Sequence, residues 1–190
     1  MKYYIKLGII LFVTCAIATG ILAYLNGLTA PMIKQVKDKE AQEAQLQVTK
    51  TGENDTNTYT FEPRFLDTDI KGDSVFYYVA FNQDNEKVGY VLTATKYGYS
   101  SNVKTVVGLN PEFKIKKIKV IDQAETPGLG AKCVNEDFAP RFVNLGLDEL
   151  KVDKDGGTIK SITGATITTR TISSSIKATL ELLIVKESKK

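Results

Sequence analysis

The longest apolar run of the chain lies at its N-terminus. No charged residue occurs from Leu7 to Ile33, and about 20 apolar residues are enough to cross a bilayer as a helix. A cleaved signal peptide would have a shorter apolar run followed by a small-residue cleavage site. The sequence that resembles such a site, Ala16-Ile17-Ala18, falls inside the run instead. We therefore expect residues 1–30 to form a retained, single transmembrane anchor.

The charges around this run bear on its orientation. Lys2 and Lys6 precede it, and three more lysines follow it at positions 34, 37 and 39. The count of positive charges alone therefore does not fix which side is inside. A short N-terminus that carries lysines usually stays in the cytoplasm. We expect a single-pass protein of the cell membrane, with its short N-terminus cytoplasmic and its domain extracytoplasmic.

The pattern changes twice after Pro31. From Met32 to Val48, apolar residues alternate with charged and amide residues at helical spacing, which predicts an amphipathic helix. This helix serves either as a stalk for the domain or as a site for a partner. Residues 49–59 are polar and rich in turn-forming residues, which favours a loop. Together, residues 31–60 form the expected stem helix and linker.

The remaining residues, 61–190, carry a β pattern followed by a helical one. Apolar and β-branched residues predict strands at 74–81, 88–95, 104–109 and 113–121, and the short connections between them favour antiparallel pairing. A last strand, or the end of one, is expected at 160–163, and a short helix at 135–143.

A longer helix is predicted near the C-terminus, from Thr169 to Lys186. Its apolar stripe consists of Ile172, Ile176, Leu180, Leu183 and Ile184. Strands followed by a helix indicate an α+β fold, in which packed helices cover an antiparallel sheet. The single transmembrane helix precedes this domain.

The composition excludes several classes of chemistry. The chain has no histidine, which rules out a Ser-His-Asp triad and histidine ligands to metal or haem. Its two cysteines, Cys15 and Cys133, are too few for an iron–sulfur cluster or a structural zinc. The residues before Cys15 also do not suit a lipoprotein site. A net charge of +3 with scattered lysines gives no reason to expect nucleic acid, and we expect no metal site.

Three polar, glycine-containing segments are candidates for the functional site. Gly98–Asn102 and Glu125–Gly130 read alone as turns, although the second exposes Leu129 on a tight backbone and could support a planar ligand. Ser161–Arg170 places hydroxyl residues around Gly164-Ala165, where the C-terminal helix begins. A helix N-terminus of this kind binds phosphate well. The alternative is a helix cap formed by Thr166 or Thr168.

These segments together resemble the FMN-binding domain family. Thr163–Thr168 matches its flavinylation motif, [Ser/Thr]-Gly-Ala-[Ser/Thr]-x-Thr, and Glu125–Gly130 matches a second signature upstream. Gly98-Tyr99, followed by 103–108, resembles a third. With its apolar N-terminus, the chain resembles the G subunit of the Rnf ion-translocating electron-transport complex, a relative of the C subunit of the Na⁺-translocating NADH:quinone reductase.

The resemblance implies an electron-carrier subunit of a membrane-bound ferredoxin:NAD-type oxidoreductase, which is not catalytic alone. In that family, FMN is attached by a phosphoester bond to the residue that corresponds to Thr168. A separate flavin transferase, which uses FAD and a divalent metal, installs it. The other subunits of the complex are the expected partners. Alternatives are a membrane-anchored sensor of the same fold, which binds flavin non-covalently or not at all, and a purely structural subunit. The expected cofactor-binding residues are Tyr99, Glu125, Thr126, Gly128, Leu129, Gly130, Thr163, Gly164, Ala165, Thr166, Thr168 and Arg170.

Overall fold

The computed structural model describes residues 2–50, 55, 57–66 and 75–188. The chain divides into two compact units, Met1–Glu40 and Ala41–Lys190. The first unit consists of most of a single helix, α1, and the second holds the sheet, the C-terminal helix and the last turns of α1.

Helix α1 (Lys2–Thr49) is continuous through Pro31. The sequence predicts an anchor and a separate stem helix, but one helix runs through both. A proline removes one backbone N–H donor and need not end a helix of this length. In its N-terminal part, an 18-residue window has a mean hydropathy of 2.3, and its side chains are not buried in the structure. By length and composition, this segment is able to cross a membrane.

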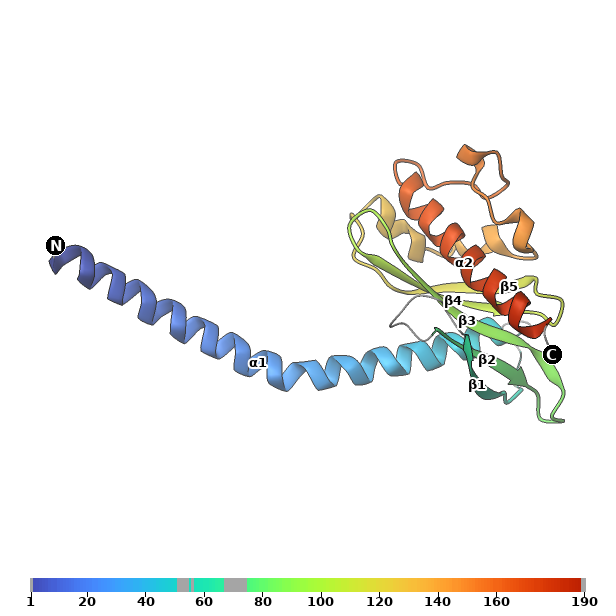
Figure 1. The fold of residues 1–190 in the computed structure, drawn as a ribbon, viewed down its shortest axis with the longest axis horizontal. Coiled ribbons are helices and arrows are strands. Elements are labelled where there is room, and N and C mark those ends of the chain that lie inside the picture. Colours follow the sequence, from blue (N-terminus) through green and yellow to red (C-terminus); the bar gives the residue numbers. More distant parts are fainter. Residues whose placement is uncertain (1, 51–54, 56, 67–74, 189–190) are drawn as a thin grey trace. The chain divides into compact units, whose positions relative to one another are not determined.

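The second unit is built on a five-stranded antiparallel sheet of order β1-β2-β3-β4-β5 (Figure 1). Its strands are β1 (Thr60–Leu66), β2 (Val75–Phe81), β3 (Lys87–Tyr97), β4 (Asn102–Leu109) and β5 (Ile115–Asp122). The predicted antiparallel α+β fold is thus confirmed. The expected start of β2 at Ser74 lies outside the described residues. Strand β1 was not predicted, because Pro63 and Arg64 interrupt its apolar pattern; proline is tolerated there since β1 is an edge strand.

A bulge explains the irregular apolar spacing of β5. Leu109 of β4 pairs with Ile115, whereas Gly108 pairs with Lys117, so Lys116 is the extra residue. The bulge reverses the alternation of faces. Ile115 and Ile118 therefore both join the main core although they are three residues apart.

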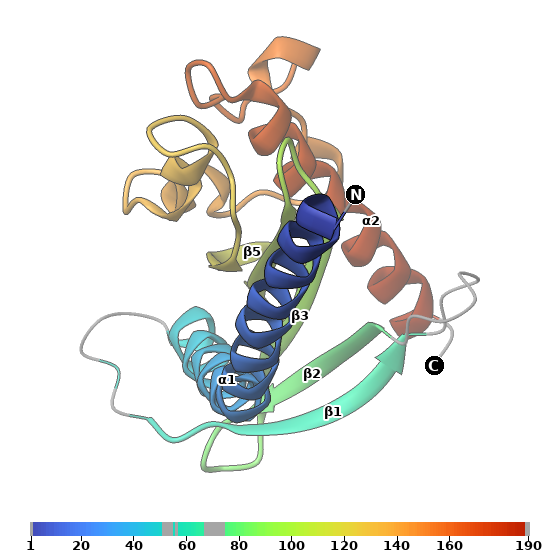
Figure 2. The ribbon, with the colours of Figure 1, turned by 90° about the vertical axis from the view of Figure 1, so that its left-hand side faces the viewer.

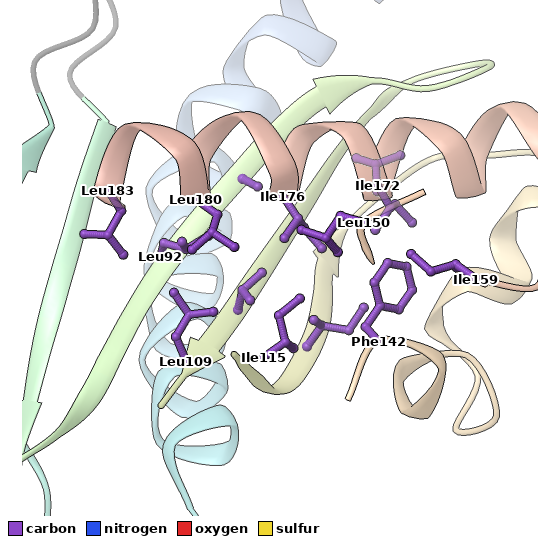
Figure 3. Close-up of a cluster of buried hydrophobic side chains, with 14 of the residues drawn as sticks. Leu92, Leu109, Ile115, Phe142, Leu150, Ile159, Ile172, Ile176, Leu180 and Leu183 are labelled. Carbon is purple, nitrogen blue, oxygen red and sulfur yellow. The ribbon is translucent and has the colours of Figure 1, made fainter. Parts of the chain in front are cut away.

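Helix α2 (Thr166–Glu187) covers one face of the sheet (Figure 1). Its apolar stripe packs against side chains of β3, β4 and β5 and of the segments that follow the sheet (Figure 3). The side chains labelled in that view are Leu92, Leu109, Ile115, Phe142, Leu150, Ile159, Ile172, Ile176, Leu180 and Leu183. This helix begins three residues earlier than the sequence pattern indicates, which places Thr168 in its first turn.

In Figure 2, the chain between β5 and α2 lies on the side of the sheet away from β1 and β2. Four short 3₁₀ segments lie in this part of the chain. They are η1 (Gly130–Val134), η2 (Ala139–Phe142), η3 (Leu147–Glu149) and η4 (Asp153–Asp155). The predicted helix at 135–143 is wrong, because only the single 3₁₀ turn η2 forms there, with Pro140 near its start. The predicted strand at 160–163 is also wrong: a lone bridge joins Val152 and Ile159 instead.

The end of α1 packs against the other face of the sheet. Ala44 and Val48 are fully buried against Val91 and Val106. Gly108 allows this contact, because a Cβ atom there would lie 2.2 Å from the carbonyl oxygen of Val48. The last turns of the expected stem helix therefore belong to the globular unit.

Candidate functional site

The site forms where α2 begins. Gly164 has a left-handed backbone (φ +77°) and turns the chain into the helix, with Ala165 as its N-cap residue. Neither Thr166 nor Thr168 caps the helix, so the helix-cap alternative is wrong. The first N–H groups of a helix have no partner within it. Among the described residues, no side chain takes up these donors as a cap, and the first turn contains no acidic residue.

Thr168 is joined to Glu125 across the site. The Thr168 hydroxyl donates a hydrogen bond of 2.6 Å to Oε2 of Glu125, and both residues are buried, with 1% and 5% of their surface exposed. The bond links the second and third motif segments through two residues that lie 43 positions apart in the sequence. The sequence did not predict this contact, although it named both residues.

Glu125 also holds the first motif segment. Its Oε1 accepts backbone N–H groups from Tyr99, Ser100 and Ser101 at 3.0–3.1 Å, and its Oε2 accepts a second contact from Tyr99 at 3.2 Å. One carboxylate therefore connects all three segments that the sequence singles out. Ser100 contributes its backbone N–H, whereas Ser101 contributes both its backbone N–H and its hydroxyl, whose oxygen accepts the N–H of Ala124 at 2.7 Å.

These bonds stabilise the charged form of Glu125. Desolvation raises the pKa of the carboxyl group, but the hydrogen bonds from Thr168, Ser100, Ser101 and Tyr99 outweigh it, and the pKa is lowered from its ordinary value. Glu125 is therefore ionised at neutral pH and acts only as an acceptor.

Two glycines allow the carboxylate to lie this close to the backbone. A Cβ atom at Gly98 would lie 2.7 Å from Oε1 of Glu125. One at Gly130 would lie 2.7 Å from Oγ1 of Thr168 and 2.8 Å from Oε2 of Glu125. Any larger residue at either position would push into the hydrogen-bonded pair.

A pocket of about 500 Å³ lies over this arrangement, within the usual range for small-molecule sites. It is lined by Tyr99, Glu125, Thr126, Leu129, Gly130, Gly164, Ala165, Thr166, Ile167 and Thr168. Tyr99, Leu129 and Ile167 are 65%, 42% and 48% exposed, and they give the pocket an apolar rim. The pocket thus combines an apolar surface with an uncapped helix N-terminus.

The chain matches the model of the FMN-binding domain over residues 98–181, the stretch that contains the three segments. It is 30% identical over 185 residues to the G subunit of the ion-translocating oxidoreductase complex of Shewanella piezotolerans, covering 93% of this chain and 87% of that one. The chain belongs to the G-subunit family of ion-translocating (Rnf) oxidoreductase complexes.

One further relative and one solved structure are similar to this chain, the first in sequence and the second in fold. The G subunit of the proton-translocating ferredoxin:NAD⁺ oxidoreductase complex of Clostridium ljungdahlii is 29% identical over 174 residues, which covers 90% of this chain and 86% of that protein. The solved structure of the C subunit of the Na⁺-translocating NADH-quinone reductase from Parabacteroides distasonis has the same fold. Its TM-score is 0.59 at 17% identity, over 79% of this chain and 93% of that chain.

The residues of this G-subunit homologue fit FMN. A flat, largely apolar ring needs an apolar surface, which Leu129 and the rest of the rim provide. A phosphate needs N–H donors and a positive dipole, which the start of α2 provides. Glycine at position 164 leaves room for Leu129 at the apolar surface, because a Cβ at Gly164 would lie 2.9 Å from the Leu129 side chain.

Three of the expected residues do not line the pocket: Thr163, Gly128 and Arg170. Thr163 and Gly128 are exposed, and Gly128 (φ +77°) serves the turn that presents Leu129. We expected Arg170 to pair with the phosphate. Instead, its guanidinium forms a two-pronged ion pair with Asp155, with both N–O distances at 2.7 Å.

Sequence reasoning missed Ile167 and the backbone of the 98–101 loop as parts of the site. Ile167 occupies the variable position of the motif, and its exposure on a helix with a buried apolar stripe is the signal that could have found it. A second hollow, of about 720 Å³, lies beside β5 and is lined by Lys116, Lys117 and Lys119 among others. None of the residues that line this hollow belongs to the three motif segments, and Cys133, whose thiol is buried, is one of them.

Proposed function

We propose that this chain is the electron-carrying G subunit of a membrane-bound, ion-translocating oxidoreductase complex, with FMN attached through a phosphoester bond to Thr168. The observation that carries the proposal is the Thr168–Glu125 hydrogen bond in the pocket wall. It places one hydroxyl of the flavinylation motif beside the second family signature, at the start of α2.

The neighbouring hydroxyls are less suited to carry the phosphate. Thr169 donates to the carbonyl of Ala165 and accepts the N–H of Ile162, and it does not line the pocket. Thr163 is exposed and lies outside the pocket lining. Thr166 lines the pocket but is not tied to Glu125. Thr168 alone in the motif combines a place in the pocket with a partner that orients its hydroxyl.

Bound FMN supplies the redox chemistry that the amino-acid side chains lack. The residues of the chain hold and orient it. The first turn of α2 supplies N–H donors and a dipole worth roughly 0.3–1 kcal/mol to the phosphate, and Leu129, Tyr99 and Ile167 offer apolar contact to the ring. Because these three side chains are exposed, a partner protein can approach the ring through the rim.

The named relatives support a proposal that this chain is part of a multi-subunit complex. The G subunits of Shewanella piezotolerans and Clostridium ljungdahlii are named as parts of ion-translocating complexes, and we propose that this chain assembles with the other subunits of such a complex. Its apolar helix supports membrane association. We further propose that the short N-terminus is cytoplasmic, that the domain is extracytoplasmic, and that a flavin transferase matures it there.

Attachment is tested by expressing the chain together with a flavin transferase and viewing denaturing gels under ultraviolet light. The wild-type band is expected to fluoresce, because a phosphoester survives denaturation. Thr168→Ala is expected to abolish the fluorescence, and Thr166→Ala, the matched control in the same helical turn, is expected to keep it. A fluorescent Thr168→Ala band would contradict the proposed attachment site. Flavin that is released on denaturation of the wild type would favour a non-covalent flavin module.

A further inference from the structure

The carboxylate of Glu125 contacts the atom to which the phosphate is attached. We infer that Glu125 orients the Thr168 hydroxyl and accepts its proton when the flavin phosphate is attached, so that the domain contributes to its own modification. This inference rests on the attachment to Thr168 proposed above.

The two oxygens of Glu125 divide their contacts. Oε1 accepts the three N–H groups of Tyr99, Ser100 and Ser101. Oε2 accepts the Thr168 hydroxyl at 2.6 Å, together with a longer contact to the N–H of Tyr99. One oxygen therefore fixes the carboxylate to the loop, while the other fixes the direction of the Thr168 proton. Since Thr168 donates to Oε2, the lone pairs of its Oγ1 point elsewhere and stay available for attack.

The attachment step balances with these groups and FAD. Oγ1 of Thr168 attacks the phosphorus of the FMN half of FAD, and an O–P bond forms. The bond from that phosphorus to the bridging oxygen of the pyrophosphate breaks, and AMP leaves with this oxygen. The Thr168 proton passes to Oε2 of Glu125 and from there to water. No oxidation or reduction takes place.

The ionised state of Glu125 makes it a proton acceptor at neutral pH, but its lowered pKa also makes it a weak base. Its lowered pKa keeps it ionised at neutral pH, so an acceptor always faces Thr168. Because a carboxylate with a lowered pKa is a weak base, Glu125 accepts the Thr168 proton only as the O–P bond forms. Much of its contribution to the attachment rate is therefore the orientation of Oγ1. Positioned proton acceptors typically contribute about 10²–10⁴-fold to a rate.

Glu125→Gln separates this role from a structural one. The amide oxygen of glutamine can still accept the loop N–H groups in place of Oε1. Its NH₂ group then faces Thr168 and donates to Oγ1, which reverses the hydrogen bond and occupies a lone pair. The matched control is Glu149→Gln. Glu149 is an exposed carboxylate that accepts a single backbone N–H, from Gly146 at 2.9 Å, away from the pocket.

The experiment uses the full-length chain in detergent, with purified flavin transferase, FAD and Mg²⁺. The initial rate of covalent flavin incorporation is measured against the concentration of the chain, by fluorescence in denaturing gels. For Glu125→Gln we expect kcat to fall about 10²-fold, with KM unchanged. For Glu149→Gln we expect wild-type values. Amide hydrogen exchange of residues 98–101 is expected to stay slow in Glu125→Gln, as a check that the loop remains bound.

Two results for Glu125→Gln would overturn the inference while leaving the attachment proposal intact. The first is a kcat equal to that of the wild type. The second is an attachment defect that is confined to KM or is accompanied by rapid amide exchange in the 98–101 loop. The second pattern would assign Glu125 a purely structural role. Failure of the attachment proposal looks different, because either the wild type would take up no flavin or Thr168→Ala would be modified like the wild type.

Discussion

Gly130 is the residue that lets Thr168 and Glu125 meet. It is buried, and its missing side chain leaves room for both the hydroxyl and the carboxylate. The sequence indicates a tight, exposed turn at Glu125–Gly130, and this description holds for its tip. It did not indicate that the two ends of the turn are buried in the site, because the partner of Glu125 lies 43 residues away, and no local pattern records such a contact.

Two glycines of one loop are expected to differ in covalent flavin attachment when each is replaced by alanine. In Gly130→Ala, the new Cβ would lie within 2.7–2.9 Å of Thr168 and Glu125, so we expect about 1–3 kcal/mol of destabilisation and loss of covalent flavin. In Gly128→Ala, the Cβ meets no atom within 4 Å. The left-handed backbone alone then costs roughly 1–2 kcal/mol, and attachment is retained.

Denaturant titration and in-gel fluorescence of the two variants check this prediction. A Gly130→Ala variant that carries covalent flavin at the wild-type level would show that the close approach at Gly130 does not matter for attachment.

At the scale of helices and strands, the apolar pattern of the sequence predicted some elements correctly and others wrongly. The strands β2, β3, β4 and β5 and the long helix α2 were predicted from their apolar and β-branched residues. Strand β1 was missed because Pro63 breaks its pattern. The segment 135–143 was wrongly predicted as a helix, because Phe138 and Phe142 are four residues apart, as on a helix, but are buried in the core by a single 3₁₀ turn. Irregular segments that bury single large residues imitate helical periodicity.

The C-terminal end of α2 is tied to the sheet by Glu187. Its carboxylate accepts hydrogen bonds from the hydroxyls of Tyr77 (2.7 Å) and Tyr90 (2.9 Å). Burial, followed by the nearby Glu187 carboxylate, raises the pKa of Tyr77 to about 12, and the same causes raise the pKa of Tyr90. The folded state therefore favours the neutral phenols.

The free energy of unfolding should consequently depend on alkaline pH. The contribution of Tyr77 is complete below pH 10, its unfolded pKa, and is lost as the pH rises through about 12; its size is about 2–3 kcal/mol. Denaturant titrations at increasing pH measure this loss. Tyr77→Phe combined with Tyr90→Phe is expected to remove the alkaline loss, and Tyr99→Phe, in an exposed loop, to leave it unchanged. An alkaline profile identical in all three chains would contradict the prediction.

At the scale of the whole molecule, the chain joins one membrane-compatible helix to one globular unit. The contacts divide the chain within α1, after Glu40. Composition alone does not reveal this boundary. Ala44 and Val48 look like part of an amphipathic stem until the sheet that covers them is known.

Truncation at two points tests this boundary. A chain that begins at Ala41 keeps the buried turns of α1 and is expected to unfold with the midpoint of the full-length protein in detergent. A chain that begins at Lys50 loses Ala44 and Val48, both fully buried, and is expected to lose at least about 2 kcal/mol. Thermal and denaturant unfolding measure both. Equal stability of the two truncated chains would contradict the packing of α1 on the sheet.

The attachment of FMN to Thr168 is tested most directly by peptide mass spectrometry. Trypsin cleaves after Lys160 and Arg170 and releases Ser161–Arg170, which contains the whole motif. In protein from cells that express a flavin transferase, this peptide is expected to carry the mass of FMN less one water, with fragment ions that assign it to Thr168. An unmodified Ser161–Arg170 peptide from flavin-loaded protein, or fragment ions that assign the mass to Thr163, Thr166 or Thr169, would contradict the account.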